Sequence, residues 1–197
     1  KNSDISFEIL LRDGGELESE FRKIAPTLIF PKYRSGLLNR VLRRLKLFLL
    51  KRRFIGDNIG LIYSNTIVNC DILEFLSFLK CPIICHIHEL EYTIKSLKIC
   101  NNFERIKDNI DQYIAVSEIV KENLIRNYKI PETKIEKIYE FVPFSNIKLQ
   151  NTKEQIYEEL KIPKEAFIIC TSGTIAWRKG PDIFIQLANH IIKRLTK

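Results

Sequence analysis

Two cations and a glycine lie between a short apolar run and an amphipathic segment near the end of the chain. The apolar run Phe167–Cys170 leads to Gly173 and Thr174, and then to Arg178 and Lys179. A helix N-terminus offers free backbone N–H groups and the positive end of its dipole, and nearby cations add charge and donors. This combination favours a site for a phosphate or diphosphate. It is not a Walker A loop, and the alternative, a loop that binds no anion, stays open.

The flanking elements would position these residues. The apolar run predicts a buried strand over Ala166–Thr171. Apolar residues then repeat at helical spacing over Pro181–Thr196. Proline suits the first helical turn, Asp182 favours the same end, and Lys193 and Arg194 favour the opposite end of the dipole.

Strand-like and helix-like segments alternate along most of the chain. The expected strands are Ser6–Leu11, Thr27–Phe30, Ile59–Ser64, Pro82–His88, Gln112–Val116, Ile135–Tyr139 and Ala166–Thr171. The expected helices are Glu16–Ile24, Ser35–Phe54, Asn69–Leu79, Leu90–Cys100, Glu118–Tyr128, Lys153–Leu160 and Pro181–Thr196. This order predicts an α/β fold with a mostly parallel sheet covered by helices. An aperiodic stretch predicts a linker at 145–152 between domains at 1–144 and 153–197.

Polar residues follow several of the expected strands. In open α/β sheets ligands bind beyond the carboxyl ends of the strands, where we expect His88, Ser117 and the Gly173–Lys179 loop. His86 shares the face of His88 because side chains alternate along a strand. Ser117 and Glu118 favour a cap and a first-turn charge for the following helix.

The cysteines and histidines do not predict a metal site. Five cysteines are present, and the odd number, with three in or beside apolar runs, favours reduced thiols. Cys81, Cys85, His86 and His88 bracket an apolar strand and lack a tight Cys-x-x-Cys turn. We therefore expect no bound metal.

Composition is that of a globular protein with excess positive charge. Of the 197 residues, 45% are hydrophobic and 28% are charged, and the net charge is +8. This charge is compatible with nucleic acid, acidic lipid or a phosphorylated ligand, or with compositional bias alone. No apolar stretch approaches the roughly 20 residues of a membrane span, and a cytoplasmic protein is expected. No methionine is present, and we interpret the chain as an internal fragment of a longer protein.

The segment Ser35–Phe54 predicts a basic amphipathic helix. Apolar residues such as Leu45 and Phe48 fall on one arc of a helical wheel, and cations fall mostly opposite. The cations assigned to a membrane-facing side are Arg40, Arg43, Arg44 and Lys51. Such a helix can lie on an anionic membrane or cover a sheet. We favour a cover helix whose apolar arc packs on the sheet and whose basic face meets lipid headgroups at the inner face of the cell membrane.

Three runs in this order are similar to GT-B glycosyltransferases of family 4. They are Ile83–Leu90, Tyr113–Glu118 and Gly173–Asp182. The resemblance implies a Rossmann-like N-terminal domain, the beginning of a second Rossmann-like domain, and retaining transfer of a sugar from a nucleotide-sugar donor. It implies a glycan, lipid-linked or other cell-surface acceptor, and no metal or other cofactor.

The resemblance also implies roles for individual residues. His88 would be catalytic, facing the sugar near its reacting carbon, with His86, Ser117 and Glu118 as secondary positions. The donor diphosphate would lie against Gly173, Thr174, Arg178 and Lys179.

The chain departs from the family pattern in places. Thr174 stands where the family often has arginine, and Glu140–Pro143 replaces an Asn-Gly-Val-Asp turn. The family's glycine-rich loop would precede Lys1 and its paired glutamates would follow Lys197, so we expect this chain alone to be inactive. Two alternatives stay open. The first is a basic α/β module that binds nucleic acid, although we do not expect a nucleic-acid partner. The second is a phosphorylase or epimerase of the same architecture.

Overall fold

A computed structural model describes residues 5–33, 35–96, 100–142 and 151–195. The chain divides into two compact units, Lys1–Phe141 and Val142–Lys197, called unit 1 and unit 2 below. Each unit is described by itself. The predicted linker lies largely outside the described residues.

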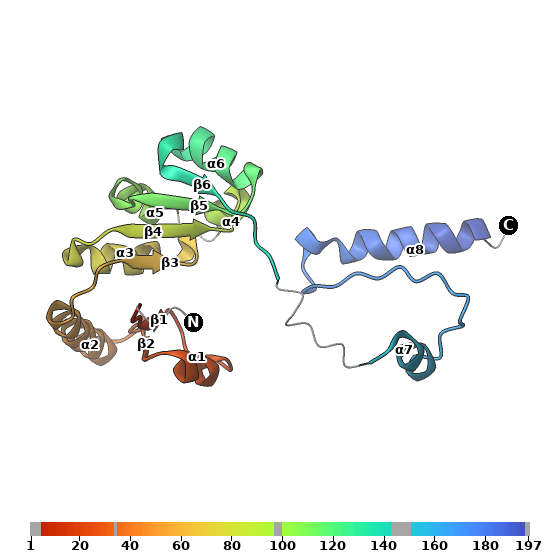
Figure 1. Cartoon of the computed structure of the whole chain (residues 1–197), viewed down its shortest axis with the longest axis horizontal. Coiled ribbons are helices and arrows are strands. Elements are labelled where there is room, and N and C mark those ends of the chain that lie inside the picture. Colours follow the sequence, from red (N-terminus) through yellow and green to blue (C-terminus); the bar gives the residue numbers. More distant parts are fainter. Residues whose placement is uncertain (1–4, 34, 97–99, 143–150, 196–197) are drawn as a thin grey trace. The chain divides into compact units, whose positions relative to one another are not determined.

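Unit 1 contains two parallel sheets (Figure 1). The larger sheet has the order β3-β4-β5-β6, and the smaller pairs β1 with β2. The strand bounds are β1 Ile9–Leu11, β2 Thr27–Ile29, β3 Ile62–Ser64, β4 Ile83–Ile87, β5 Gln112–Ala115 and β6 Ile135–Lys137. Each lies within a segment predicted as a strand, and the predicted α/β fold class is confirmed.

Helices connect the strands of unit 1. The α-helices are α1 Glu18–Ile24, α2 Leu37–Gly56, α3 Cys70–Leu76, α4 Glu91–Ser96, α5 Cys100–Ile106 and α6 Glu118–Tyr128. Short 3₁₀ turns are η1 Ile67–Asn69, η2 Ser77–Leu79, η3 Lys107–Asn109 and η4 Glu132–Lys134. Only α5 has no counterpart among the predicted helices.

The two faces of the larger sheet differ in burial. On one face, Cys85, Tyr113 and Ala115 are fully buried in a core with helices α3, α5 and α6. On the other face, the residues that lie side by side in neighbouring strands are partly or largely exposed. They include Tyr63, Ile84, His86 and Ile114. A parallel sheet is ordinarily covered on both faces, and in the described residues only one face of this sheet has a full cover.

Helix α2 packs by a different side from the one predicted. Phe54 is buried, and Leu47 and Leu50 pack beside it against α3 and the strands. Arg43, which the helical wheel places among the membrane-facing cations, is half-buried on this packed side and donates from Nε to the Pro31 carbonyl at 3.1 Å. The predicted packing side, and with it the outward position of Arg43, is wrong, because both sides of the helix carry apolar residues.

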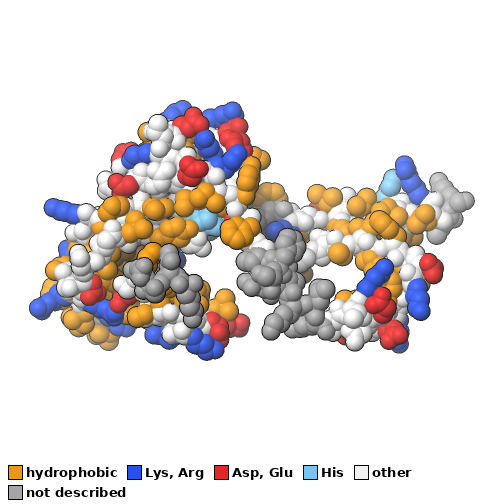
Figure 2. Space-filling model, viewed as in Figure 1, with side chains coloured by type: hydrophobic (Ala, Val, Ile, Leu, Met, Phe, Trp, Pro, Cys, Tyr) orange, Lys and Arg blue, Asp and Glu red, His pale blue; other side chains and the backbone are white. Residues whose placement is uncertain are grey.

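The apolar arc expected to pack on the sheet is exposed instead. Its exposed residues are Leu37, Leu38, Val41, Leu42, Leu45, Phe48 and Leu49. At 3.6 residues per turn this arc lies opposite the packed side. Figure 2 shows basic and hydrophobic side chains together on the lower edge of unit 1, where Figure 1 places α2. Among the described residues, no helix is long and apolar enough to cross a membrane.

Unit 2 contains α7 (Lys153–Glu159), η6 (Trp177–Lys179) and α8 (Pro181–Leu195). A capping box between Thr152 and Gln155 begins α7. The strand predicted over Ala166–Thr171 is absent, and Phe167 is 90% exposed. A strand requires hydrogen bonds from a neighbouring strand, and the described part of unit 2 contains none. No described side chain of unit 2 is buried.

Candidate functional site

His88 lies at the carboxyl end of β4, in the middle of the larger sheet. Its Nδ1 is 2.9 Å from Oε1 of Glu140, which follows β6. The Glu140 carboxylate accepts the Nδ1 proton, so Nε2 is the acceptor atom whenever the ring carries a single proton. The pair therefore fixes the tautomer in which Nε2 can receive a proton or a hydrogen bond.

Glu89 connects the end of β4 to the turn after β3. One carboxylate oxygen accepts from the Thr66 hydroxyl, and the other accepts from the backbone N–H of His88 at 3.1 Å and of Ile67 at 3.4 Å. Three donors from two strand ends thus converge on one carboxylate. Glu89 therefore fixes the position of the His88 backbone at the end of β4.

His86 precedes His88 by two residues, and its side chain lies on the same face of β4. The two ring centroids are 4.4 Å apart, and His86 Nδ1 is 2.7 Å from the Tyr63 hydroxyl. Burial lowers the pKa of His86, and the neighbouring His88 lowers it further, whereas Glu140 and Glu89 raise it in part. His86 is therefore held neutral at neutral pH.

The Nε2 atoms of both histidines are enclosed by protein. Neither has a hydrogen-bond partner among the described residues. Enclosed polar atoms are ordinarily hydrogen-bonded. The two unpaired nitrogens therefore mark this strand end as a place where a further polar group would be stabilised.

Ser117 and Glu118 have structural partners. The Ser117 hydroxyl caps α6 by accepting from the Val120 N–H at 3.3 Å, which confirms the predicted cap. Glu118 lies in the first turn of α6 and forms an ion pair with Lys137 on β6 at 2.7 Å. Both residues fix the start of α6 beside the carboxyl edge of the sheet.

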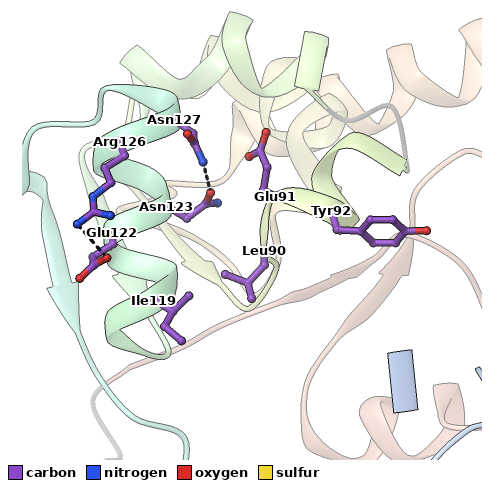
Figure 3. A pocket seen from close by; sticks show the side chains of 8 residues that line it. All are labelled: Leu90, Glu91, Tyr92, Ile119, Glu122, Asn123, Arg126 and Asn127. Carbon is purple, nitrogen blue, oxygen red and sulfur yellow. Dashed lines mark hydrogen bonds and ion pairs between the residues drawn. The ribbon is translucent and has the colours of Figure 1, made fainter. Parts of the chain in front are cut away.

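A shallow pocket of about 460 Å³ lies between the start of α4 and one side of α6 (Figure 3). Its lining residues are Leu90, Glu91, Tyr92, Ile119, Glu122, Asn123, Arg126 and Asn127. In Figure 3 Asn123 and Glu91 lie on opposite sides of the gap, and Tyr92 points away from it. Leu90 follows His88 by two residues, so the pocket adjoins the histidines without including them.

In unit 2, Lys179 lies over Gly173. A Cβ added at Gly173 would be 3.3 Å from Lys179 Cδ, and the φ of +149° is one that other residues rarely adopt. Lys179 ends η6, and Gly180 in the left-handed conformation leads into α8. Thr174 is exposed near this turn, and Arg178 lies within η6. The bare backbone at Gly173 lets the lysine stem cross the loop just before a helix N-terminus.

The predicted residues therefore form two groups. His86, His88, Ser117 and Glu118 gather at one edge of unit 1, whereas Gly173 to Lys179 form a loop of unit 2. Sequence reasoning missed Tyr63, Glu89 and Glu140. The position of Glu140, directly after the last strand of the sheet, is the signal that could have identified it as a neighbour of His88. The described residues contain no group of three or more metal-binding side chains.

The chain matches the family model described as Glycosyltransferase Family 4 over residues 7–145, more than half of its length. Among solved structures it is similar to HepE from Anabaena, crystallised in complex with UDP and glucose, with 17% sequence identity and a TM-score of 0.55. This similarity covers 78% of the chain but only 42% of HepE, and it shows a shared fold. No curated protein matches the chain.

Replacing Glu89 by alanine should destabilise unit 1. The Glu89→Ala change leaves three donors without their acceptor, and we expect a loss of about 2 kcal/mol in the free energy of unfolding, measured by urea denaturation. Glu122→Ala, which removes an exposed ion pair of α6, should cost less than about 0.5 kcal/mol. Equal losses in the two variants would contradict the role of Glu89.

His86 should make stability depend on pH. Its folded pKa lies below the ordinary value of 6.5, so the unfolded chain binds the proton first as pH falls. The free energy of unfolding should therefore decrease as pH drops through about 6.5 and below. The decrease in the free energy of unfolding should be smaller in His86→Gln. The control variant His190→Gln, on α8, should show the same decrease as the wild type. Identical pH profiles for the wild type and His86→Gln would refute this assignment.

Proposed function

This chain belongs to glycosyltransferase family 4, and on that premise we propose that it is part of a retaining, metal-independent GT-B transferase. The enzyme moves a sugar from a nucleotide-sugar donor to a glycan, lipid-linked or other cell-surface acceptor. The family match over residues 7–145 carries the proposal. The UDP and glucose bound in the HepE structure support a nucleotide-sugar donor.

Unit 2 supplies the donor diphosphate site in this proposal. Lys179 and Arg178 neutralise the negative charge that develops on the leaving nucleoside diphosphate, and prearranged cations lower the barrier of such a step. Gly173 leaves room for the Lys179 stem beside the phosphates, Thr174 offers its hydroxyl to them, and the N-terminus of α8 adds its dipole. The contact between the Lys179 stem and Gly173 supports this arrangement.

Unit 1 supplies the residues near the sugar. His88 faces the donor sugar near its reacting carbon, and Glu140 holds its Nδ1. His86, Ser117 and Glu118 support this edge of the sheet. A phosphorylase or epimerase would use the same architecture, and product analysis with and without inorganic phosphate separates it from a transferase.

We also propose that α2 lies on the anionic inner face of the cell membrane, which places the enzyme in the cytoplasm as a peripheral protein. The helix carries seven cations and no carboxylate. At 100° per residue its exposed apolar arc is bordered by Arg40, Arg44 and Lys51 on one side and by Lys46 and Arg53 on the other, and Arg52 lies within the arc near its C-terminal end. An apolar stripe bordered by cations is typical of a helix in the plane of a membrane interface. We do not propose a nucleic-acid partner for this helix.

Lys179 should be required for turnover. In the active transferase, Lys179→Ala should lower kcat/KM for release of UDP from UDP-glucose by about 100-fold or more, while Lys179→Arg keeps the charge and much of the activity. Because Lys179 is exposed, circular dichroism should show an unchanged fold. The 197-residue chain itself should release no UDP.

The matched control is Lys193→Ala in the last turn of α8, which should leave turnover unchanged. Turnover by Lys179→Ala within about twofold of the wild type would refute the diphosphate site. If no tested nucleotide sugar is consumed by the wild type, the transferase proposal itself fails.

Binding of α2 to lipid should require its exposed cations. The pair Arg40→Ala and Arg44→Ala should weaken binding to phosphatidylcholine vesicles containing phosphatidylglycerol by roughly 30-fold, since each cation contributes about 1 kcal/mol. The measurement is vesicle co-sedimentation. The control pair, Lys193→Ala and Arg194→Ala, should bind like the wild type.

Phe48→Glu, on the exposed arc, should also weaken this binding, because the arc enters the interface. Binding that is insensitive to Phe48→Glu and to Arg40 and Arg44 would contradict the membrane proposal. Salt-dependent retention of DNA on filters would instead favour the nucleic-acid module.

A further inference from the structure

We propose that the pocket between α4 and α6 is a second binding site of unit 1, and that its ligand is a neutral sugar ring. Asn123 on α6 and Glu91 at the start of α4 lie on opposite sides of the gap (Figure 3). The pocket volume of about 460 Å³ falls within the roughly 300–1,000 Å³ of small-molecule sites. Binding at this pocket requires neither a donor nor turnover, so it is independent of the proposed transfer reaction.

Asn123 is a buried residue whose side-chain donor is unused. The residue is 8% exposed, and its Oδ1 accepts from Nδ2 of Asn127 at 2.7 Å. Its own Nδ2 is enclosed and has no hydrogen-bond partner among the described residues. A buried donor without an acceptor costs free energy, and the bond from Asn127 keeps the donor end of the amide available. The pocket therefore requires a ligand atom that accepts a hydrogen bond.

Glu91 supplies the opposite kind of group. Its Oε1 pairs with Lys95 at 2.8 Å, and its side chain is 29% exposed. Burial raises the pKa of Glu91, but hydrogen bonds from Lys95 and Tyr128 bring it below its ordinary value. Glu91 is therefore a carboxylate at neutral pH. A carboxylate only accepts hydrogen bonds and has more acceptor positions than these partners use, so the pocket also requires a donor on the ligand.

A hydroxyl group meets both requirements, because it donates one hydrogen bond and accepts others. An ammonium ion has donors only and would leave the Asn123 donor without an acceptor. A phosphate has acceptors, but it would be repelled by the carboxylates of Glu91 and Glu122. Arg126, which also lines the pocket, is already paired with Glu122 at 3.2 Å. The charges of the lining therefore favour a neutral ligand that carries hydroxyl groups.

The apolar part of the lining suits a ring. Leu90 and Ile119 line the pocket from α4 and α6, and they are 42% and 66% exposed. A sugar ring carries C–H groups on its faces and hydroxyl groups around its edge. One face can therefore cover Leu90 and Ile119 while the edge reaches Asn123 and Glu91. Apolar walls with a few polar groups are typical of sites for small ligands.

This pocket is separate from the histidine site. Leu124 of α6 and Ile94 of α4 belong to the core on the face of the sheet that Cys85 occupies. His86 lies on the other face, because side chains alternate along β4, and the ring of His88 lies beside it. A sugar bound between α4 and α6 is therefore not the sugar that His88 faces in the proposed reaction.

Nuclear magnetic resonance on the 197-residue chain tests the site directly. The probes are glucose, galactose and N-acetylglucosamine, with inorganic phosphate and ethylammonium as charged probes. We expect at least one sugar to shift the side-chain NH₂ resonances of Asn123 in a saturable way, with a Kd in the millimolar range. Neither charged probe should shift them. UDP-glucose should bind here no more tightly than glucose, because the two carboxylates disfavour its diphosphate.

Two variants test the role of the amide, with the methyl resonances of Leu90 and Ile119 as the readout. Asn123→Leu removes the donor and keeps a similar size, so we expect sugar binding to weaken by about 10-fold or more. Its urea midpoint should not fall, because the unpaired buried donor is removed as well. Asn127→Ala, at an exposed position, frees the amide to rotate and should weaken binding by about threefold.

The matched control is Arg105→Ala, which removes an exposed ion pair with Glu74 on α3 and should bind the sugar like the wild type. Three results would overturn the proposal. The first is that no probe sugar shifts these resonances. The second is that phosphate or ethylammonium binds more tightly than every sugar. The third is that sugar binding is unchanged in both Asn123→Leu and Asn127→Ala, which would place the sugar elsewhere.

Discussion

The backbone of β4 is hydrogen-bonded on both sides, to β3 and to β5, and this pairing sets the position of every residue at its end. A parallel strand has no hydrogen bonds of its own and depends on its neighbours. With both neighbours present, Cys85 and Ile87 are fully buried, and the chain leaves the sheet at a defined point. The same requirement explains why Ala166–Thr171, without a neighbour, forms no strand.

The histidine site follows from this pairing. Because β4 and β6 end at the same edge of one sheet, His88 and Glu140 meet although 52 residues separate them. Glu89 adds a bond from the end of β4 to the turn after β3. The imidazole is therefore held both through its backbone and through its ring.

Local patterns predicted much of the fold. The Ser117 cap and the apolar repeat predicted α6 over its observed bounds, and the apolar run at Pro82–His88 predicted β4. Periodicity could not reveal which side of α2 packs, because two sides of that helix are apolar. Helix α5 was missed because its start, at Cys100, carries no capping residue. The bonds of Glu89 and Glu140 depend on strand order, which spacing along the chain does not contain.

A structure of the active transferase with bound UDP tests the donor site most directly. We expect Lys179 Nζ to lie within about 3 Å of a diphosphate oxygen, as in charge-assisted hydrogen bonds, with the diphosphate near the start of α8. A diphosphate bound elsewhere, with Lys179 pointing into solvent, would contradict it.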